Sequence, residues 1–392
     1  MKVCLVNLAA LPALSHAHKH ERVGGEEVQH AQLATALARR GHDVHLVVAD
    51  YGQPEGLRID GVTVHKAFRE SEGVPLLRFV HPRWTKLWAA IWRANADVYY
   101  CSCAGMLVGL LAMFCGLNRR RLVFRVASDA DCYPDRLLVR HARDRWLYEY
   151  GLRRADATLV QSVTQQSALL ANYGRESTVA GMLVVGPDPA AVRAAKDIDV
   201  LWVANIRRVK RPDRLLELAR LLPQVSFVMA GGASPGEEAL YGQIEREART
   251  IPNLRFLGPV PYLDIGPLFG RARVFANTSE VEGFPNTFLQ SWIRGVAVVT
   301  LFDPDGLVRS RQLGSAHANV AEMATGVAKL LEDPALEAIV SSRVREFMAQ
   351  HYGEETVLGP YLAALVGGHM NVETLSARHH RPAGSRSEAP RA

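Results

Sequence analysis

The stretch of sequence with the most specific chemistry covers residues 279–299. A carboxylate there is followed at once by a short run that opens an amphipathic helix: Glu282, Gly283, Phe284, Pro285, Asn286 and Thr287. Backbone amides at a helix N-terminus lack intrahelical partners and lie at the positive end of the helix dipole, so this run suits an anion such as a diphosphate. Glycine at 283 permits close backbone approach. The plain alternative is an ordinary strand-to-helix turn, which does not require this run.

A second candidate is the basic loop at residues 204–213, which has four cations in five positions just before a predicted helix. They are Arg207, Arg208, Lys210 and Arg211. Such cations can neutralise charge that grows on a leaving group, a task that a divalent metal performs in other enzymes. No Asp-x-Asp pair stands beside this loop, so we expect neither a metal nor another cofactor. A solvated basic turn is the alternative.

With the flanking Gly295-Val-Ala-Val-Val, the run that begins at Glu282 resembles the donor-sugar motif of retaining glycosyltransferases of family 4, which have the two-domain GT-B fold. The resemblance covers most of the chain. It implies that Glu282 contacts hydroxyls of the donor sugar. A second Glu of the family motif, which holds the ribose, is replaced here by Gln290. The amide of Gln290 has only one acceptor oxygen, so donor affinity or the ribose position is expected to differ.

The same resemblance assigns roles in the basic loop. The family places an Arg and, five residues later, a Lys on the donor diphosphate. Lys210 matches the Lys, whereas Asn205 occupies the Arg position. We therefore nominate Arg207, from the same loop, as the replacement cation.

Apolar β-type runs alternate with helical patterns along the chain, which is typical of parallel α/β sheets. The first half starts with a strand at 2–8, a glycine turn, a helix at 26–40 and a strand at 44–48. Later strands are predicted at 122–126 and 157–161. The second half has strands at 200–204, 225–230, 254–257, 274–276 and 296–301, with helices at 212–221, 235–250, 286–294, 320–331 and 334–350.

The fold class is thus α/β, with two Rossmann-like domains and a cleft between them. We predict an acceptor domain at 1–190, a donor domain at 199–352, a closing helix at 354–366 that packs back toward the first domain, and a disordered tail at 369–392. Ligands of such sheets lie beyond the carboxyl ends of the strands, so the loops after the strands are where chemistry is expected.

Two features of the first half belong to this cleft. Gly24 and Gly25, ahead of the first helix, are expected to cover the donor phosphates from the opposite domain. Asp129 and Asp131 follow the strand at 122–126 and are candidates to bind acceptor hydroxyls. Local capping of the loop is an equally good interpretation, since Asp commonly bonds nearby backbone.

Other clusters point away from metal or disulfide chemistry. His16, His18 and His20 alternate in a loop without a Cys or carboxylate at ligand spacing, so acceptor contact or solvent exposure is preferred to a metal site. Five cysteines, all in the first half, do not make a secreted disulfide framework and indicate reduced thiols in a cytoplasmic protein. Cys101 and Cys103 are expected to be packed thiols on a strand.

The formal charge of +6 is unevenly divided. Residues 1–195 contain 24 Lys or Arg against 18 Asp or Glu, and residues 196–392 contain 22 of each. This excludes a uniformly basic nucleic-acid coat. Residues 78–93 place Trp84, Trp88 and Trp92 on one helix face among cations, and more cations follow at 119–125. These are typical of a helix at an anionic membrane surface, although a core helix with basic edges fits as well.

Residues 98–118 are uncharged and long enough for a membrane span. The Tyr-Tyr-Cys-Ser-Cys start resembles a strand end and the remainder is too short to cross a bilayer, so we predict a strand followed by a buried helix. Residues 3–8 likewise favour a first strand over a signal peptide.

Together these features predict a retaining glycosyltransferase, a hexosyltransferase that uses a nucleotide diphosphate-sugar and a glycan or lipid-linked acceptor, in cell-surface polysaccharide or glycolipid assembly. No nucleic-acid partner is expected. The location predicted is cytoplasmic, with peripheral contact at the inner face of the cytoplasmic membrane. Two alternatives stay open: a non-catalytic nucleotide-sugar-binding partner of a glycan-assembly complex, motivated by Gln290 and Asn205, and a GT-B sugar-nucleotide epimerase.

Overall fold

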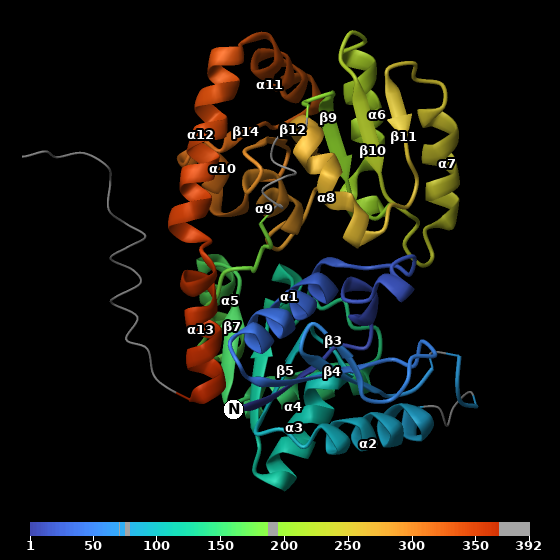
Figure 1. The fold of residues 1–392 in the computed structure, drawn as a ribbon, viewed down its shortest axis with the longest axis vertical. Coiled ribbons are helices and arrows are strands. Elements are labelled where there is room, and N and C mark those ends of the chain that lie inside the picture. The colour runs from blue at the N-terminus through green and yellow to red at the C-terminus, as the bar shows by residue number, and fades with distance from the viewer. Residues whose placement is uncertain (70, 75–78, 187–194, 368–392) are drawn as a thin grey trace, which may run out of the picture.

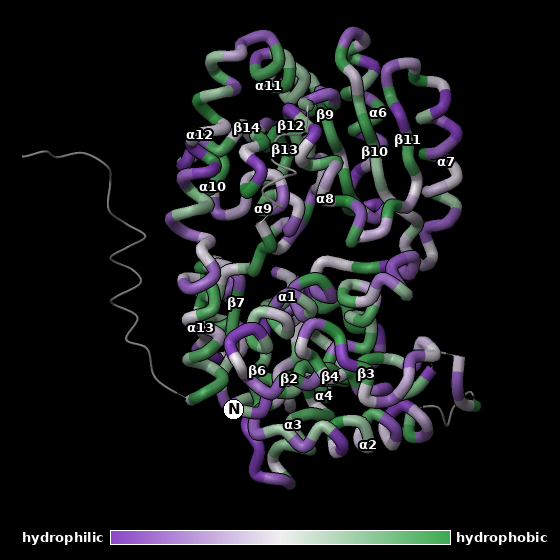
Figure 2. Tube along the Cα trace, viewed as in Figure 1, coloured by the Kyte–Doolittle hydropathy of each residue, from purple (hydrophilic) through white to green (hydrophobic). Residues whose placement is uncertain are grey.

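The computed structural model describes residues 1–69, 71–74, 79–186 and 195–367. Over these residues the chain forms two α/β domains, which lie one above the other in Figure 1. The buried apolar residues fall on the strands of both sheets and on the helix faces that cover them (Figure 2). The predicted α/β class and the two Rossmann-like domains are confirmed.

The first domain is built on a sheet whose described strands follow the order β3-β4-β2-β1-β5-β6-β7-β8. Neighbouring strands are parallel except for β3 and β4. Their bounds are β1 Lys2–Val6, β2 Asp43–Val48, β3 Leu57–Ile59, β4 Val62–Lys66, β5 Val98–Ser102, β6 Arg121–Arg125, β7 Ala157–Val160 and β8 Thr178–Val179. The helices are α1 Gly25–Arg39, α2 Thr85–Ala94, α3 Met106–Asn118, α4 Ala142–Arg154 and α5 Val163–Tyr173.

The second domain has a parallel sheet in the order β11-β10-β9-β12-β13-β14 over the described residues. Its strands are β9 Ile198–Val203, β10 Phe227–Ala230, β11 Leu254–Phe256, β12 Ala272–Asn277, β13 Ala297–Thr300 and β14 Gly314–Ala316. The helices are α6 Pro212–Leu221, α7 Glu238–Ala248, α8 Tyr262–Arg271, α9 Asn286–Trp292, α10 Leu307–Ser310, α11 Val320–Glu332 and α12 Pro334–His351.

The last described helix, α13 (Glu354–Val366), has the predicted bounds and lies against the first domain (Figure 1). Val357, Leu358 and Tyr361 are buried in the core of that domain. The Tyr361 hydroxyl donates to the Gly181 carbonyl at 2.9 Å. At its N-terminus Glu354 meets Arg39 of α1 at 2.9 Å. The predicted tail at 369–392 lies outside the described residues.

The uncharged stretch at 98–118 is divided as predicted into a strand, β5, and a helix, α3. Both pack into the first domain, α3 most deeply at Val108 and Leu111. Among the helices that the structure describes, none combines the length and the apolar character that crossing a bilayer would require.

Two predictions in the first domain are wrong. Cys103 does not lie on the strand: β5 ends at Ser102, and Cys103 is exposed, with a left-handed φ of 69°. The cations at 119–125 do not form a basic face either. Arg125 is fully buried, and Arg121 points toward α13, where its Nε donates to the Ala364 carbonyl at 2.8 Å. Arg121 and Arg125 are four residues apart on β6, so their side chains leave the same face of the strand, and α13 packs against that strand.

The aromatic helix is partly core. Trp84 and Trp88 pack against the first-domain core, whereas Trp92 is 60% exposed. Two of its cations are paired within the domain, Lys86 with Glu72 and Arg93 with Glu55. Arg78, which we included in this face, lies outside the described residues. Much of the expected basic surface is therefore neutralised by neighbouring carboxylates.

Candidate active site

The loops that we singled out meet because of the strand order of the second sheet. β9 and β12 are adjacent and parallel, with β10 and β11 on one side and β13 and β14 on the other. This is the point at which the strand order reverses, where open α/β sheets bind ligands beyond the carboxyl ends of their strands. The basic loop follows β9 and the Glu282 run follows β12, so residues some seventy positions apart in the chain become neighbours.

Lys210 and Glu282 form the centre of this arrangement. The Lys210 ammonium donates to Oε1 of Glu282, and the two side chains are only 13% and 12% exposed. The Ser279 hydroxyl donates to the same oxygen at 2.7 Å. Ser279 itself is buried just beyond the end of β12. The carboxylate is thus held between an ammonium and a hydroxyl at the mouth of the second sheet.

Burial lowers the pKa of Lys210, and the ion pair with Glu282 offsets only part of that effect. The charge of Arg207 lowers the Lys210 pKa further. Arg207 is exposed, three residues before Lys210. Asn205 instead points across the domain boundary, with its Nδ2 donating to the Val23 carbonyl at 3.1 Å.

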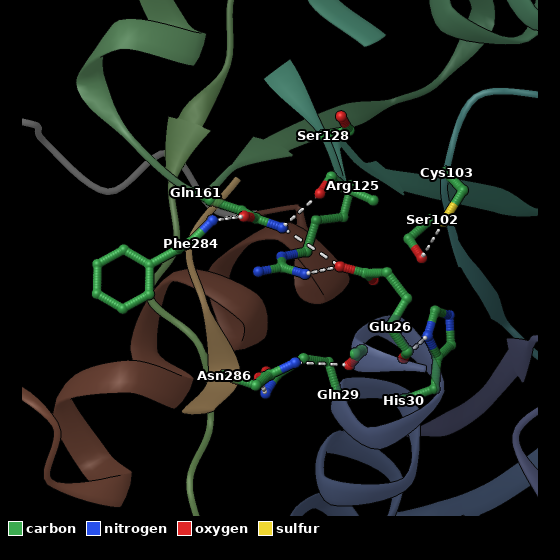
Figure 3. A network of polar contacts seen from close by, with 12 residues as sticks. Glu26, Gln29, His30, Ser102, Cys103, Arg125, Ser128, Gln161, Phe284 and Asn286 are labelled. Atoms are coloured by element: carbon green, nitrogen blue, oxygen red, sulfur yellow. Dashed lines mark hydrogen bonds and ion pairs between the residues drawn. The ribbon is translucent and has the colours of Figure 1, made fainter. Parts of the chain in front are cut away.

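The first domain contacts the Glu282 run directly. The Phe284 amide donates to Oε1 of Gln161 at 2.9 Å (Figure 3). A Cβ at Gly283 would lie 2.8 Å from the same Gln161 oxygen. In this structure the close approach that glycine permits at 283 is therefore to the opposite domain.

Asn286 bridges to the glycine turn and to α1. Its Nδ2 donates to the Gly25 carbonyl at 2.9 Å, and its Oδ1 accepts from Gln29 at 2.7 Å (Figure 3). A Cβ at Gly25 would lie 2.6 Å from the Asn286 nitrogen. Gly24 precedes it at the N-terminus of α1, where a Cβ would meet the Glu27 carboxylate at 2.4 Å.

The rest of the motif lies in α9 or at its start. Pro285 is the N-cap residue of α9. The Phe284 ring lies edge-to-face with Trp292 and tilted against Tyr352, at centroid distances of 6.3 Å each. Thr287 and Gln290 are half-buried, on the first and second turns of the helix.

Asp129 and Asp131 lie after β6, at the carboxyl edge of the first sheet. Asp131 accepts from the backbone amides of Ala127 at 3.1 Å and Ser128 at 3.2 Å. These contacts fit the alternative role given above, in which Asp131 caps its own loop. Burial raises the pKa of Asp131 to about 6. Asp129 accepts from Gln165 at 2.8 Å. Asp131 also lines a cavity of about 330 Å³ beside Gly105, Arg140 and His141.

Four residues of the site were not singled out from the sequence: Gln29, Glu26, Arg125 and Gln161. Nη1 of Arg125 donates to Oε1 of Glu26 at 2.9 Å, and Gln161 donates to the same oxygen at 3.3 Å (Figure 3). Glutamines within ordinary helical or strand-end patterns carry no signal of this role. Only the position of Arg125, as a cation ending a buried strand, was a usable clue.

No group of three or more His, Cys, Asp or Glu able to hold a metal occurs in the part of the chain that the structure describes. His16, His18 and His20 lie in and just beyond a 3-10 turn, with Ser15 contacting His18 Nδ1 at 3.1 Å.

The buried Lys210–Glu282 pair lies at the switch point of the second domain, and loops of the first domain face it. This arrangement defines a two-domain α/β enzyme with its site between the domains. Family models account for both halves: a glycosyl transferase 4-like domain matches residues 24–180, and a glycosyl transferases group 1 domain matches residues 188–347. The chain belongs to the family 4-like glycosyltransferases of GT-B fold.

Solved structures agree in fold. A sucrose-phosphate synthase from Thermosynechococcus elongatus superposes with a TM-score of 0.71 at 17% identity, covering 93% of this chain and 99% of its own. Anabaena HepE, solved with UDP and glucose, gives 0.71 at 17% identity over 96% and 100%. WaaG, a glycosyltransferase involved in lipopolysaccharide biosynthesis, gives 0.65 at 14% identity over 93% and 100%. No curated protein matches the sequence.

Proposed function

We propose that this glycosyltransferase moves a hexose, with retention of configuration, from a nucleotide diphosphate-sugar to a hydroxyl of a glycan or lipid-linked acceptor. The observation that carries the proposal is the buried Lys210–Glu282 pair at the switch point of the second sheet. It places a cation and a carboxylate side by side where a ligand of such a fold binds.

In this scheme the two side chains separate when the donor binds. The Lys210 ammonium turns to the diphosphate and stabilises the negative charge that grows as the bond to the sugar breaks. Glu282, freed from the ion pair, accepts hydrogen bonds from sugar hydroxyls, as the family motif implies. Arg207 adds positive charge from the exposed edge of the loop. The family resemblance supports departure and attack on the same face of the sugar, with no protein nucleophile.

UDP-hexoses are the donors we favour. The HepE structures hold UDP, UDP-glucose, or UDP with glucose, and they share this fold over nearly the whole chain. The description of WaaG supports a role in glycolipid or cell-surface polysaccharide assembly. We place the acceptor at the carboxyl edge of the first sheet, beside the cavity that Asp131 lines.

A thermal-shift panel of nucleotide diphosphates and their sugars tests the donor site. A ligand that binds only the folded state stabilises it by about 2.7 kcal/mol at a concentration of a hundred times Kd, and this raises the melting temperature. We expect UDP to stabilise the protein. Lys210→Met should abolish the UDP shift, whereas Glu282→Gln should keep that shift and lose the added effect of the sugar.

Matched controls are available in the same loops. Arg208→Met removes an exposed cation two residues from Lys210, and Glu280→Gln removes an exposed carboxylate two residues from Glu282. Both should leave the UDP and UDP-sugar shifts intact. If no nucleotide shifts the protein, or if Glu282→Ala leaves transfer intact, the proposed site is wrong.

Release of UDP separates the reaction classes. A transferase releases nucleotide diphosphate only when an acceptor is present, whereas an epimerase returns an altered nucleotide sugar and a non-catalytic partner does neither. Product analysis by chromatography, with and without acceptor, distinguishes the three.

A further inference from the structure

The donor loop, residues 282–286, is contacted from the first domain by two carboxamides. Gln161, just after β7, accepts from the Phe284 amide at 2.9 Å. Gln29, in α1, donates to Oδ1 of Asn286 at 2.7 Å. Figure 3 shows both glutamines reaching toward the loop from the first-domain side. The donor loop thus belongs to the second domain but is contacted at two points by the first.

Further hydrogen bonds, to groups of the first domain, fix the orientation of both carboxamides. Gln161 uses its nitrogen to donate to the Ala127 carbonyl at 3.1 Å and to Glu26 at 3.3 Å, so its oxygen must face Phe284. Gln29 accepts from the Leu183 amide at 2.8 Å and donates to the Leu183 carbonyl at 2.9 Å. The oxygen of a carboxamide accepts hydrogen bonds and its nitrogen donates them, so these partners identify which end of each side chain is the oxygen and which is the nitrogen. The two side chains are 9% and 4% exposed.

A larger residue at either of two glycines would displace these contacts. A Cβ at Gly283 would stand 2.8 Å from the Gln161 oxygen and 3.1 Å from the Ala127 carbonyl. A Cβ at Gly25 would stand 2.6 Å from the Asn286 nitrogen. A side chain at either glycine would therefore push away the carboxamide that contacts it.

We propose that Gln161 and Gln29 are positioning residues for sugar transfer. They fix the donor loop from the first domain, so that Glu282 reaches the sugar in the orientation that the reaction needs. Neither glutamine contacts the substrate in this scheme. This inference rests on the proposed function, because it assigns Glu282 to the donor sugar.

The two domains then control different parts of the site. Lys210 and Ser279, which hold the Glu282 carboxylate, both come from the second domain. Loss of Gln161 leaves those contacts in place, and with them the Lys210 ammonium that we assign to the diphosphate. It releases the backbone two residues beyond Glu282, so the carboxylate loses its fixed orientation. The rate of transfer is therefore expected to fall more than nucleotide affinity.

Hydrogen exchange measured by mass spectrometry on the donor-free protein tests the contact. The probe is the peptide that contains the Phe284 amide. In Gln161→Met, which keeps side-chain length but removes both polar ends, we expect this peptide to exchange about five-fold faster, the factor that corresponds to one net hydrogen bond. Gln29→Met, which acts on Asn286, is an independent second variant.

The control is Gln32→Met. Gln32 lies on the same helix, is 9% exposed, and also crosses the domain boundary, but it donates to the Tyr262 hydroxyl at 2.9 Å and not to the donor loop. In Gln32→Met, the peptide that contains Phe284 should exchange at the same rate as in the unaltered protein. Unchanged exchange in both Gln161→Met and Gln29→Met overturns the proposal.

Kinetics complete the test with UDP-hexose as donor. For Gln161→Met we expect kcat to fall at least about ten-fold while the UDP-induced thermal shift and the donor KM change less than about three-fold. Faster exchange without a fall in kcat would refute the positioning role while leaving the transferase assignment intact. Absence of any nucleotide-induced shift in the unaltered protein would instead refute the proposed function itself.

Discussion

At Lys210 burial and charge act in opposite directions on the side chain. Its ammonium is removed from water at the edge of the second sheet, where it donates to Glu282, a carboxylate that also accepts from Ser279. A buried ammonium that is only partly compensated releases its proton more readily than a surface lysine. In the donor-free protein the ammonium is paired with the Glu282 carboxylate, and this pairing offsets part of the cost of keeping both groups out of water.

The lowered Lys210 pKa predicts the pH dependence of the reaction. The charged form is the one that binds diphosphate, so kcat/KM should begin to fall at a pH below about 10.4, the ordinary lysine value. The profile of kcat/KM reports the free enzyme, in which this pKa applies. It is measured over the alkaline range at saturating acceptor.

Lys210→Arg is the matched variant, because arginine stays charged throughout that range. We expect it to be slower but to lack the alkaline fall. An identical fall in Lys210→Arg would show that another group titrates.

At the scale of elements, β6, β7 and α1 are joined by a buried ion pair. Arg125 ends β6 with no exposed surface, and its partner Glu26 stands in the first turn of α1, 15% exposed. Gln161, beyond β7, bonds to the same carboxylate. Nε and Nη2 of Arg125 and Oε2 of Glu26 are buried without a hydrogen-bond partner among the described residues. The pair therefore links three elements while being incompletely satisfied.

Breaking this pair from one side should be costly. Arg125→Met leaves the Glu26 charge in a largely buried position, and removal of one partner of a buried pair costs about 3–5 kcal/mol. Adding Glu26→Gln removes the orphaned charge, so the double variant should recover part of that loss. Urea unfolding of the single and double variants, combined as a double-mutant cycle, measures the coupling. Simple additivity would mean that the two side chains do not interact.

At the scale of the whole molecule, one end of the first domain exposes large apolar side chains. α2 and α3 lie at the end remote from the second domain (Figure 1). Trp92 of α2 is 60% exposed and Leu117 of α3 is 76% exposed. Arg83 and Arg119 lie close by in sequence. This end is the surface at which we propose peripheral contact with an anionic membrane, through fewer cations than the sequence predicted.

Vesicle co-sedimentation tests that contact. Anionic vesicles should retain the protein at low salt and release it at high salt. The attraction of anionic lipid for each nearby cation is roughly 1 kcal/mol, and salt screens it. Trp92→Ala should reduce retention, whereas Trp146→Ala, which removes another exposed tryptophan of the first domain, should not. Equal recovery on neutral and anionic vesicles would remove the membrane contact and leave the transferase assignment unaffected.

Much of the fold was predictable from periodicity. The helix at 212–221 was placed correctly because its apolar residues recur at helical spacing after Pro212. The helix at 354–366 was placed correctly because an apolar run follows two acidic residues at its start. The helix α8 was missed, since Gly266 and Pro267 interrupt its pattern. β3 and β14, each three residues long, were missed because a strand so short has too few alternating positions to be recognised.

The sequence by itself determined the fold class, the family and the types of residue in the donor motif, because these depend on local spacing. Only the tertiary structure decided which residues meet. Strand order brings Lys210 to Glu282, and domain contact brings Gln161 to Phe284 and Gln29 to Asn286. It also sent Arg125 inward, away from the surface proposed for it. Those contacts join positions far apart in the chain, and a local pattern carries no information about partners that the path of the backbone selects.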